Sequence, residues 1–179
     1  MKKKEIHSII EALLFSSEEP LTQKQAEQCL EEKIDLHTLT EELNAHYLAN
    51  NTPLTIQNLA EGYRIMVSDK YNQYTSKLNS TKAQARLSDS AIEILSIIAY
   101  KQPCTKSEID SIRGVSSYLK SLLEKKLIEI KGRVSGPGRP LLYGTTQKFL
   151  EYFGLESLDA LPRMKELEEI INEEPRKND

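Results

Sequence analysis

The residues that could hold a metal ion or start a covalent reaction are few in this 179-residue chain, and their spacing fits neither role. Zinc sites in proteins place their cysteine and histidine ligands in closely spaced pairs. No such pair occurs among the cysteines and histidines, which are Cys29, Cys104, His7, His37 and His46. The sequence therefore predicts no metal site and no cofactor.

Cys104 and the paired carboxylates are the remaining candidates for catalysis. An internal repeat, described below, aligns Cys104 with Leu21, which favours a small buried apolar residue over a nucleophile. The acidic pairs at residues 41–42 and 168–169 lie in charged stretches, where a solvated helix face is the ordinary interpretation. No set of acid, base and nucleophile can be assembled, so we predict that the chain is not an enzyme.

A glycine- and proline-rich segment superficially resembles a phosphate-binding loop; it reads Gly136-Pro-Gly-Arg-Pro140. It lacks the Gly-Lys-Ser/Thr ending of such loops, and its prolines have no N–H to donate to a phosphate. Glycine at positive φ and proline at fixed φ suit a stiff hairpin tip. We expect a rigid wing that presents Arg139 to a partner, with an ordinary tight turn as the alternative.

A helix-turn-helix over residues 95–114 is the clearest structural signal in the chain. Pro103 ends its first helix, because the proline ring blocks the helix and restricts the residue before it. Thr105 and Glu108 form a capping box that starts the second helix. Gly114 suits the left-handed residue that terminates a helix.

The same order of elements is predicted twice. Apolar periodicity and turn residues in the first half predict helices over 4–17, 22–30 and 35–49, a hairpin from strands 54–57 and 63–67 that turns at Glu61-Gly62, and a short helix over 69–78. In the second half they predict helices over 89–101, 105–113 and 116–126, a hairpin from 127–134 and 141–143, a helix over 147–153 and a charged tail helix over 164–171. A shift of 83 positions aligns Pro20 with Pro103 and Thr22 with Thr105, so one unit is used twice.

Three helices followed by a two-stranded hairpin are typical of a winged helix-turn-helix. We therefore predict a mainly α fold with small β-hairpin wings, in which two winged-helix domains lie in tandem. The predicted boundaries are an N-terminal domain over 1–80, a linker over 81–87, a C-terminal domain over 88–162 and a charged tail over 163–179.

Bulk composition predicts a soluble cytoplasmic protein. Its 39% hydrophobic and 28% charged residues are ordinary for a globular chain. Glu11 interrupts the early apolar run, and nothing approaches the roughly 18 apolar residues of a membrane helix, so neither a signal peptide nor a membrane partner is expected. Two cysteines fit a reducing compartment. The net charge of −3 argues against a surface built throughout for nucleic acid.

Direct DNA binding by the second winged helix is an alternative hypothesis. The side chains that would carry it are the cations of helix 116–126 and of the wing: Lys120, Lys125, Lys131 and Arg133. Glu124 and Glu129 lie among them. The matching helix of the first half has no Lys or Arg between Asp35 and Asn50, and an acidic recognition helix would repel the phosphate backbone. Only the second half is therefore a candidate DNA reader.

Several sequence blocks together resemble the bacterial segregation and condensation protein B family. In the second half these blocks are Ile97-Ile-Ala-Tyr-Lys-Gln-Pro103, Glu108-Ile-Asp-Ser-Ile-Arg-Gly-Val115, Gly136-Pro-Gly-Arg-Pro-Leu-Leu-Tyr-Gly-Thr-Thr146, Phe149-Leu-Glu-Tyr-Phe-Gly-Leu155 and Ser157-Leu-Asp-Ala-Leu-Pro162. The first half agrees more loosely, through Ile10-Glu-Ala-Leu-Leu-Phe15, Pro20-Leu-Thr22 and Gly62-Tyr-Arg64. The chain is shorter than the family pattern after Val115, which affects only where the following helix begins.

The resemblance implies two winged-helix domains, a homodimer formed mainly through the N-terminal domain, and no enzymatic activity. It implies binding to the kleisin subunit, segregation and condensation protein A, which closes the ATPase heads of the SMC dimer. The chain would then be cytoplasmic and nucleoid-associated, would meet the SMC ATPase through the kleisin, and would contact DNA indirectly or weakly. We expect the kleisin to contact the C-terminal domain at Tyr100, Arg113, Arg139, Leu141, Leu142 and Tyr143. The alternative is that Tyr100, Leu142 and Tyr143 are core residues and that Arg113 interacts only with helix-end carbonyls.

Overall fold

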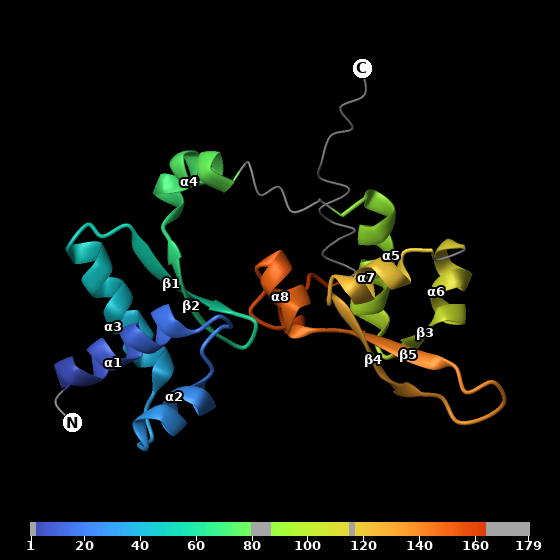
Figure 1. Cartoon of the computed structure of the whole chain (residues 1–179), viewed down its shortest axis with the longest axis horizontal. Helices are drawn as coiled ribbons and strands as arrows, with labels where there is room; N and C mark the ends of the chain where they lie inside the picture. The colour runs from blue at the N-terminus through green and yellow to red at the C-terminus, as the bar shows by residue number, and fades with distance from the viewer. Residues whose placement is uncertain (1–2, 80–86, 115–116, 164–179) are drawn as a thin grey trace.

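The computed structural model describes residues 3–79, 87–114 and 117–163. Residues 3–79 are called the first half below, and residues 87–114 and 117–163 the second half. The first half consists of α1 (Lys3–Ser16), α2 (Gln23–Leu30), α3 (Leu36–Ala49), the strands β1 (Leu54–Leu59) and β2 (Gly62–Val67), the 3₁₀ turn η1 (Asp69–Tyr71) and α4 (Asn72–Asn79) (Figure 1). Three helices followed by a hairpin are therefore observed, as predicted.

The starts of α2 and α3 follow from local side-chain chemistry. The Thr22 hydroxyl accepts a hydrogen bond from the backbone N–H of Gln25, and the Gln25 side chain accepts one from the N–H of Thr22. A capping box therefore starts α2. Asp35 caps α3 by accepting a hydrogen bond from the N–H of Thr38. In both places a side chain satisfies a backbone donor that the first helical turn leaves free.

The turn of the β1–β2 hairpin differs from the prediction. Ala60 and Glu61 are its central residues, both with positive φ (51° and 61°), and Gly62 is already in β2. The prediction of a Glu61-Gly62 turn was therefore wrong. Gly62 has another reason to be glycine, because a Cβ there would lie 2.9 Å from the carbonyl oxygen of Pro20. The chain approaches closely at this point because Leu21 pairs with the neighbouring Tyr63.

The second half repeats this order with an additional short strand. It contains α5 (Asp89–Lys101), β3 (Cys104–Thr105), α6 (Lys106–Arg113), α7 (Leu119–Glu124), β4 (Ile128–Arg133), β5 (Leu141–Thr145), α8 (Gln147–Phe153) and the 3₁₀ turn η3 (Leu158–Ala160). The strands form an antiparallel sheet in the order β3-β5-β4. The sequence did not predict β3, and α7 is shorter than the predicted helix over 116–126. The predicted tail helix over 164–171 lies outside the described residues.

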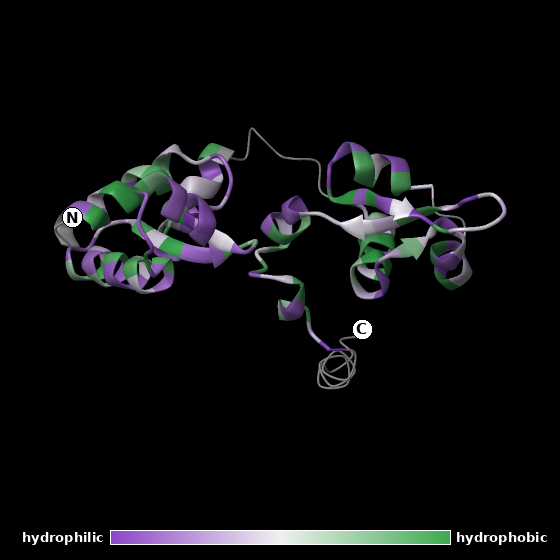
Figure 2. Cartoon of the chain, turned by 90° about the horizontal axis from the view of Figure 1, so that it is seen from below, coloured by the Kyte–Doolittle hydropathy of each residue, from purple (hydrophilic) through white to green (hydrophobic). Residues whose placement is uncertain are grey.

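Each half has its own buried cluster of apolar side chains. The first cluster joins α1, α2, α3 and β1, and its buried members are Ile10, Leu14, Leu21, Ala26, Leu36, Leu43, Tyr47 and Ile56. The second joins α5, α6, α7, the sheet and α8. Figure 2 shows hydrophobic and hydrophilic residues on different faces of the helices in both halves, as expected for helices with one packed face. Within the described ranges, no helix combines the length and apolarity that crossing a membrane requires.

The internal repeat is visible in the contacts as well as in the sequence. Leu21 pairs with Tyr63 of β2, and Cys104, its counterpart, pairs with Tyr143 of β5. Both Leu21 and Cys104 are buried. The prediction that Cys104 is a small buried core residue is therefore confirmed.

Candidate partner-binding surface

Metal ligands and the Cys104 thiol are the candidates for chemistry among the described residues. No group of three or more histidine, cysteine or acidic side chains in this part of the chain could hold a metal ion. Burial, with the negative charge of Glu108, raises the pKa of the Cys104 thiol, which disfavours the thiolate. The search for a functional site therefore turns to surfaces that can bind a partner.

Three of the six residues expected to contact a partner lie on β5, with different exposure. Tyr143 is 8% exposed and belongs to the buried cluster beneath the hairpin. Leu141 and Leu142 are partly exposed, and Leu141 packs against the same cluster. Among these three, only the two leucines present surface to a partner, while Tyr143 belongs to the core.

Tyr100 and Arg113 lie on α5 and α6, and each is held by a contact within the second half. Tyr100 is 40% exposed, and its hydroxyl donates a hydrogen bond to the carbonyl oxygen of Pro162 at 2.7 Å. Arg113 donates hydrogen bonds to the Glu93 carboxylate and to the hydroxyl of Ser90. Both side chains are thus ordered at the surface, and Arg113 is held by α5 side chains rather than by helix-end carbonyls.

The tip of the β4–β5 hairpin has the geometry of the stiff wing that the sequence predicts. Gly136 and Gly138 have φ of 125° and 74°, which side chains rarely permit. Arg139 follows them, exposed, with its carbonyl oxygen accepting a hydrogen bond from the Arg133 guanidinium at 3.3 Å. The wing therefore projects the Arg139 side chain away from the core.

The four cations of the alternative DNA-binding hypothesis do not form an uninterrupted basic surface. Lys131 pairs with Glu129, and Lys120 lies 3.9 Å from Glu124 on α7. Lys125 lines a cavity of about 250 Å³ together with Glu124 and two other lysines. Carboxylates beside these cations reduce the positive charge available to a phosphate backbone.

Two of the family-like sequence blocks are explained by one contact between them. The Gln102 side-chain oxygen accepts hydrogen bonds from the backbone N–H of Thr145, at 2.7 Å, and from its hydroxyl, at 3.0 Å. A Cβ at Gly144 would lie 2.9 Å from that same oxygen. The contact therefore uses the glutamine that follows α5 and fits closely against the glycine in β5, and it ties the sheet to the end of the helix.

The two halves are joined by the tip of the first hairpin. The N–H of Ala60 donates to the carbonyl oxygen of Leu155 at 2.9 Å, and the N–H of Glu61 donates to that of Glu156 at 2.7 Å. The Gln147 side chain donates to the carbonyl oxygen of Ala60 at 2.9 Å. The backbone of the turn is thus bound on both sides by the second half.

Side chains complete this junction. Leu59 and Ala60, 6% and 0% exposed, pack in the buried cluster of the second half rather than in that of the first. Arg64 of β2 pairs with Glu151 of α8 at 2.8 Å and also bonds the carbonyl oxygen of Glu18. Sequence reasoning missed this contact. The sequence signal for this contact was the block Gly62-Tyr-Arg64. This block is part of the family resemblance, but the apolar periodicity does not explain it.

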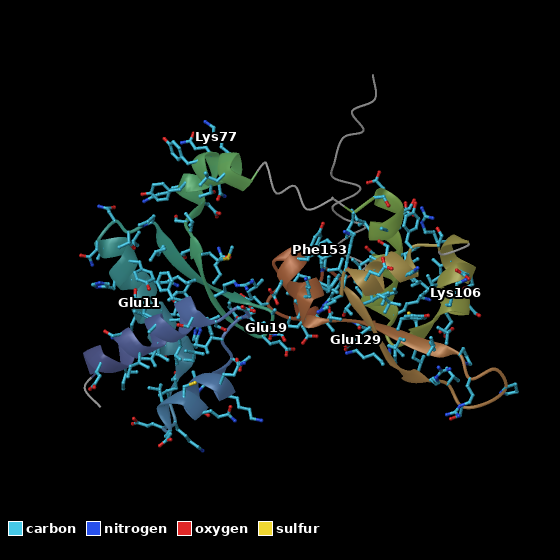
Figure 3. The ribbon with its side chains drawn as sticks, viewed as in Figure 1. Glu11, Glu19, Lys77, Lys106, Glu129 and Phe153 are labelled. Atoms are coloured by element: carbon cyan, nitrogen blue, oxygen red, sulfur yellow. The ribbon has the colours of Figure 1, made fainter. Side chains whose placement is uncertain are left out.

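A groove lies beside the junction, and residues of both halves line it. Its volume is about 820 Å³. Glu18 and Glu19 of the first half form one wall, and residues 128–131 of β4 and 145–148 form the other. Figure 3 labels Glu19 and Glu129, which lie on either side of the junction.

Comparison with known proteins identifies the family. The family model described as segregation and condensation complex subunit ScpB matches residues 8–164. The chain belongs to this family. The resemblance predicted from the sequence blocks is thereby confirmed, and the ScpB match spans both halves and the junction between them.

Relatives of similar length bear the same description. A segregation and condensation protein B of Syntrophotalea carbinolica is 42% identical over 172 residues, covering 94% of this chain and 87% of the relative. One of Bacillus cereus (strain G9842) is 42% identical over 177 residues, covering 97% of this chain and 93% of the relative.

A solved structure is also similar to this chain. It is the crystal structure of a conserved hypothetical protein from Chlorobium tepidum, which is 39% identical, with a match that covers 86% of this chain and 98% of that chain and has a TM-score of 0.44.

Proposed function

We propose that this chain is a non-enzymatic adaptor of the bacterial segregation and condensation complex, acting in chromosome condensation and partition during cell division. The observation that carries the proposal is the ScpB family match over residues 8–164. The adaptor consists of two winged-helix domains, over 1–80 and 88–162, joined by a linker over 81–87 and followed by a charged tail over 163–179.

The partner in this proposal is the kleisin subunit, and its contact surface is the C-terminal domain. The exposed or partly exposed members of the expected site are Tyr100, Arg113, Arg139, Leu141 and Leu142. They combine apolar side chains with two arginines, a composition suited to protein contacts. Tyr143 belongs to the buried cluster, against which Leu141 packs. The SMC ATPase and DNA are reached through the kleisin, which places the protein in the cytoplasm at the nucleoid.

A homodimer through the N-terminal domain is the second part of the proposal. Leu48 at the end of α3, and Tyr74 and Leu78 of α4, are 76%, 62% and 79% exposed. All three are large apolar side chains of the first half, and exposed apolar side chains are suited to burial against a second copy. Light scattering after size-exclusion chromatography tests this. A Leu48→Asp, Tyr74→Asp variant should have half the mass of the wild type.

Titration of the purified kleisin subunit into the wild type and single variants tests the site. Arg139→Glu and Tyr100→Ala should each weaken binding by at least tenfold, about 1.4 kcal/mol. Lys24→Glu is a matched control for the charge reversal, because Lys24 is exposed on α2 of the other half. If both site variants bind like the wild type while circular dichroism shows them folded, the proposed contact surface is wrong. Tyr143→Ala is unsuitable here because a buried aromatic side chain supports the fold itself.

A further inference from the structure

A short segment, residues 155–162, leads from the end of α8 to the carbonyl group that Tyr100 binds; it is called the strap below. Its first two carbonyl oxygens belong to the junction, where they accept hydrogen bonds from the N–H groups of Ala60 and Glu61, at 2.9 and 2.7 Å. The carbonyl oxygen of its last residue, Pro162, accepts a hydrogen bond from the Tyr100 hydroxyl at 2.7 Å. The strap therefore contacts the first half at one end and a residue of the proposed partner-binding surface at the other.

Local geometry makes the strap stiff. Gly154, just before it, has a left-handed conformation, and the N–H of Leu155 donates back to the carbonyl oxygen of Leu150 at 2.9 Å. The middle of the strap is the 3₁₀ turn η3, and Leu161 after it is extended, as a residue before proline prefers. The ring of Pro162 then fixes its own φ. A displacement at one end is thus not absorbed by a freely rotating chain between the ends.

Side chains attach the strap to the second half over part of its length. Leu155 and Leu161 pack against the buried cluster of the second half. Glu156, Leu158 and residues 159–160 are exposed. The hydrogen bonds at the two ends therefore supplement two packed leucines in holding the strap in place.

Tyr100 presents its ring to solvent while its hydroxyl is engaged by the strap. The side chain is 40% exposed on α5, and the hydrogen bond to Pro162 restricts its rotamers. A side chain that is ordered before binding loses less conformational entropy when a partner covers it. The strap therefore prepares Tyr100 for a partner as long as the strap itself is held.

We propose that the strap couples the junction to the partner-binding surface, so that docking of the first half strengthens partner binding at Tyr100. The inference rests on the proposed function, in which the partner is the kleisin, and adds how the two halves cooperate in binding it. The docked first half orders the strap, and the strap orders Tyr100. Because coupling between two sites is reciprocal, kleisin bound at Tyr100 should in turn stabilise the junction.

Tyr100→Phe tests the coupling without any partner. The variant removes the hydroxyl that binds the strap and keeps the aromatic ring. Loss of this hydrogen bond should let the amides of Ala60 and Glu61 exchange about threefold to tenfold faster. Tyr152→Phe is the matched control, because Tyr152 is 42% exposed in the same half and its hydroxyl has no hydrogen-bond partner among the described residues. The control should exchange like the wild type at both amides.

The amide of Leu161 distinguishes local loosening from transmission along the strap. It donates to the carbonyl oxygen of Leu158 at 3.1 Å, close to the end that Tyr100 holds. Faster exchange both there and at the junction supports the inference. If Tyr100→Phe accelerates Leu161 alone, or neither site, the strap does not transmit and the inference is overturned. Equal acceleration in the middle of α3 would mean a global loss of stability, which also overturns it.

Leu59→Asp tests the coupling from the other end, in calorimetric titrations with the purified kleisin. Leu59 is 6% exposed and packs in the buried cluster of the second half, so an aspartate there is costly to bury and keeps the halves apart. Kleisin binding should weaken by about threefold to tenfold, although Leu59 presents almost no surface to a partner. Asn58→Asp, which adds the same charge at the exposed neighbouring position of β1, should bind like the wild type.

The outcomes separate this inference from the proposed function. Wild-type affinity of Leu59→Asp, with both halves folded by circular dichroism, would refute the coupling. If that variant does not fold, the wild type decides, because bound kleisin should slow exchange at Ala60 and Glu61 and unchanged exchange contradicts the inference. No measurable kleisin binding by the wild type would refute the proposed function itself, and Tyr100→Phe would still decide whether the strap links Tyr100 to the junction.

Discussion

Replacing Leu59 by alanine should uncouple the two halves of the chain. Leu59 is 6% exposed and packs in the buried cluster of the second half, although its strand belongs to the first. Burying a leucine side chain is worth about 1.5–3 kcal/mol, and each neighbouring backbone hydrogen bond adds about 0.5–1.5 kcal/mol. The halves can separate instead of leaving a cavity, so we expect a loss of about 2–4 kcal/mol in the free energy of opening the junction.

Hydrogen exchange at single residues measures this free energy where it acts. The amides of Ala60 and Glu61 donate to Leu155 and Glu156, so they exchange only when the junction opens. A loss of 2–4 kcal/mol corresponds to exchange faster by about 30-fold or more. Amides in the middle of α3 should exchange at wild-type rates, because the first cluster does not contain Leu59.

Leu59→Met provides the matched control, since a volume-conserving change in a core usually costs less than about 1.5 kcal/mol. It should keep most of the protection at Ala60 and Glu61. If the alanine variant exchanges like the wild type at both amides, the junction does not depend on Leu59, and the reasoning from burial is refuted. If the amides of α3 lose equal protection, the effect is global and not a separation of the halves.

Three further predictions follow from single positions. Gly62→Ala should lower the free energy of unfolding by about 1–3 kcal/mol in urea titrations, because its Cβ would lie 2.9 Å from the Pro20 carbonyl oxygen, a backbone atom that moves only with the chain. Hydrogen bonds from the backbone N–H and hydroxyl of Thr105 lower the pKa of Glu108, so this carboxylate stabilises the fold above its ordinary pKa of 4.5 and loses that effect as pH falls through the lowered value. Glu108→Gln keeps the capping box, and its neutral amide corresponds to the protonated carboxyl of the wild type. The stability of this variant should therefore decline less than that of the wild type between neutral pH and pH 3 in thermal melts. An unaltered pH profile would contradict this. A thiol reagent should label the exposed Cys29 at once and the buried Cys104 only on unfolding, and equal labelling rates in the native protein would contradict the burial of Cys104.

Local chemistry explains why the helices were predictable from the sequence. The capping boxes at Thr22 and Thr105 each use two residues three positions apart, so no distant contact is needed to start α2 or α6. The helix α8 was predicted with the bounds that it has, Gln147–Phe153; in the structure Thr146 caps it and Gly154 ends it in a left-handed conformation. Where the signal was weaker, as before α7, the predicted helix began too early.

The candidate site was only partly predictable, because exposure depends on packing. Tyr143 and Leu142 are adjacent in one strand, and alternation alone does not say which of them faces the core. The structure decides this by pairing Tyr143 with Cys104 of β3, a strand too short to be recognised in the sequence. The wing tip was easier, because glycines and prolines in a row restrict the backbone whatever surrounds them.

The sequence by itself determined the helices, the internal repeat, the stiff wing and the family, because these depend on neighbouring residues or on blocks of matching sequence. Only the tertiary structure decided what joins the two halves. Leu59, Ala60 and Arg64 look like ordinary hairpin residues until the chain brings them against α8 and Leu155, more than 80 positions away in the case of Arg64 and Glu151. Contacts at such separation have no local signal, since they depend on how two packed units dock and not on the preferences of any single segment.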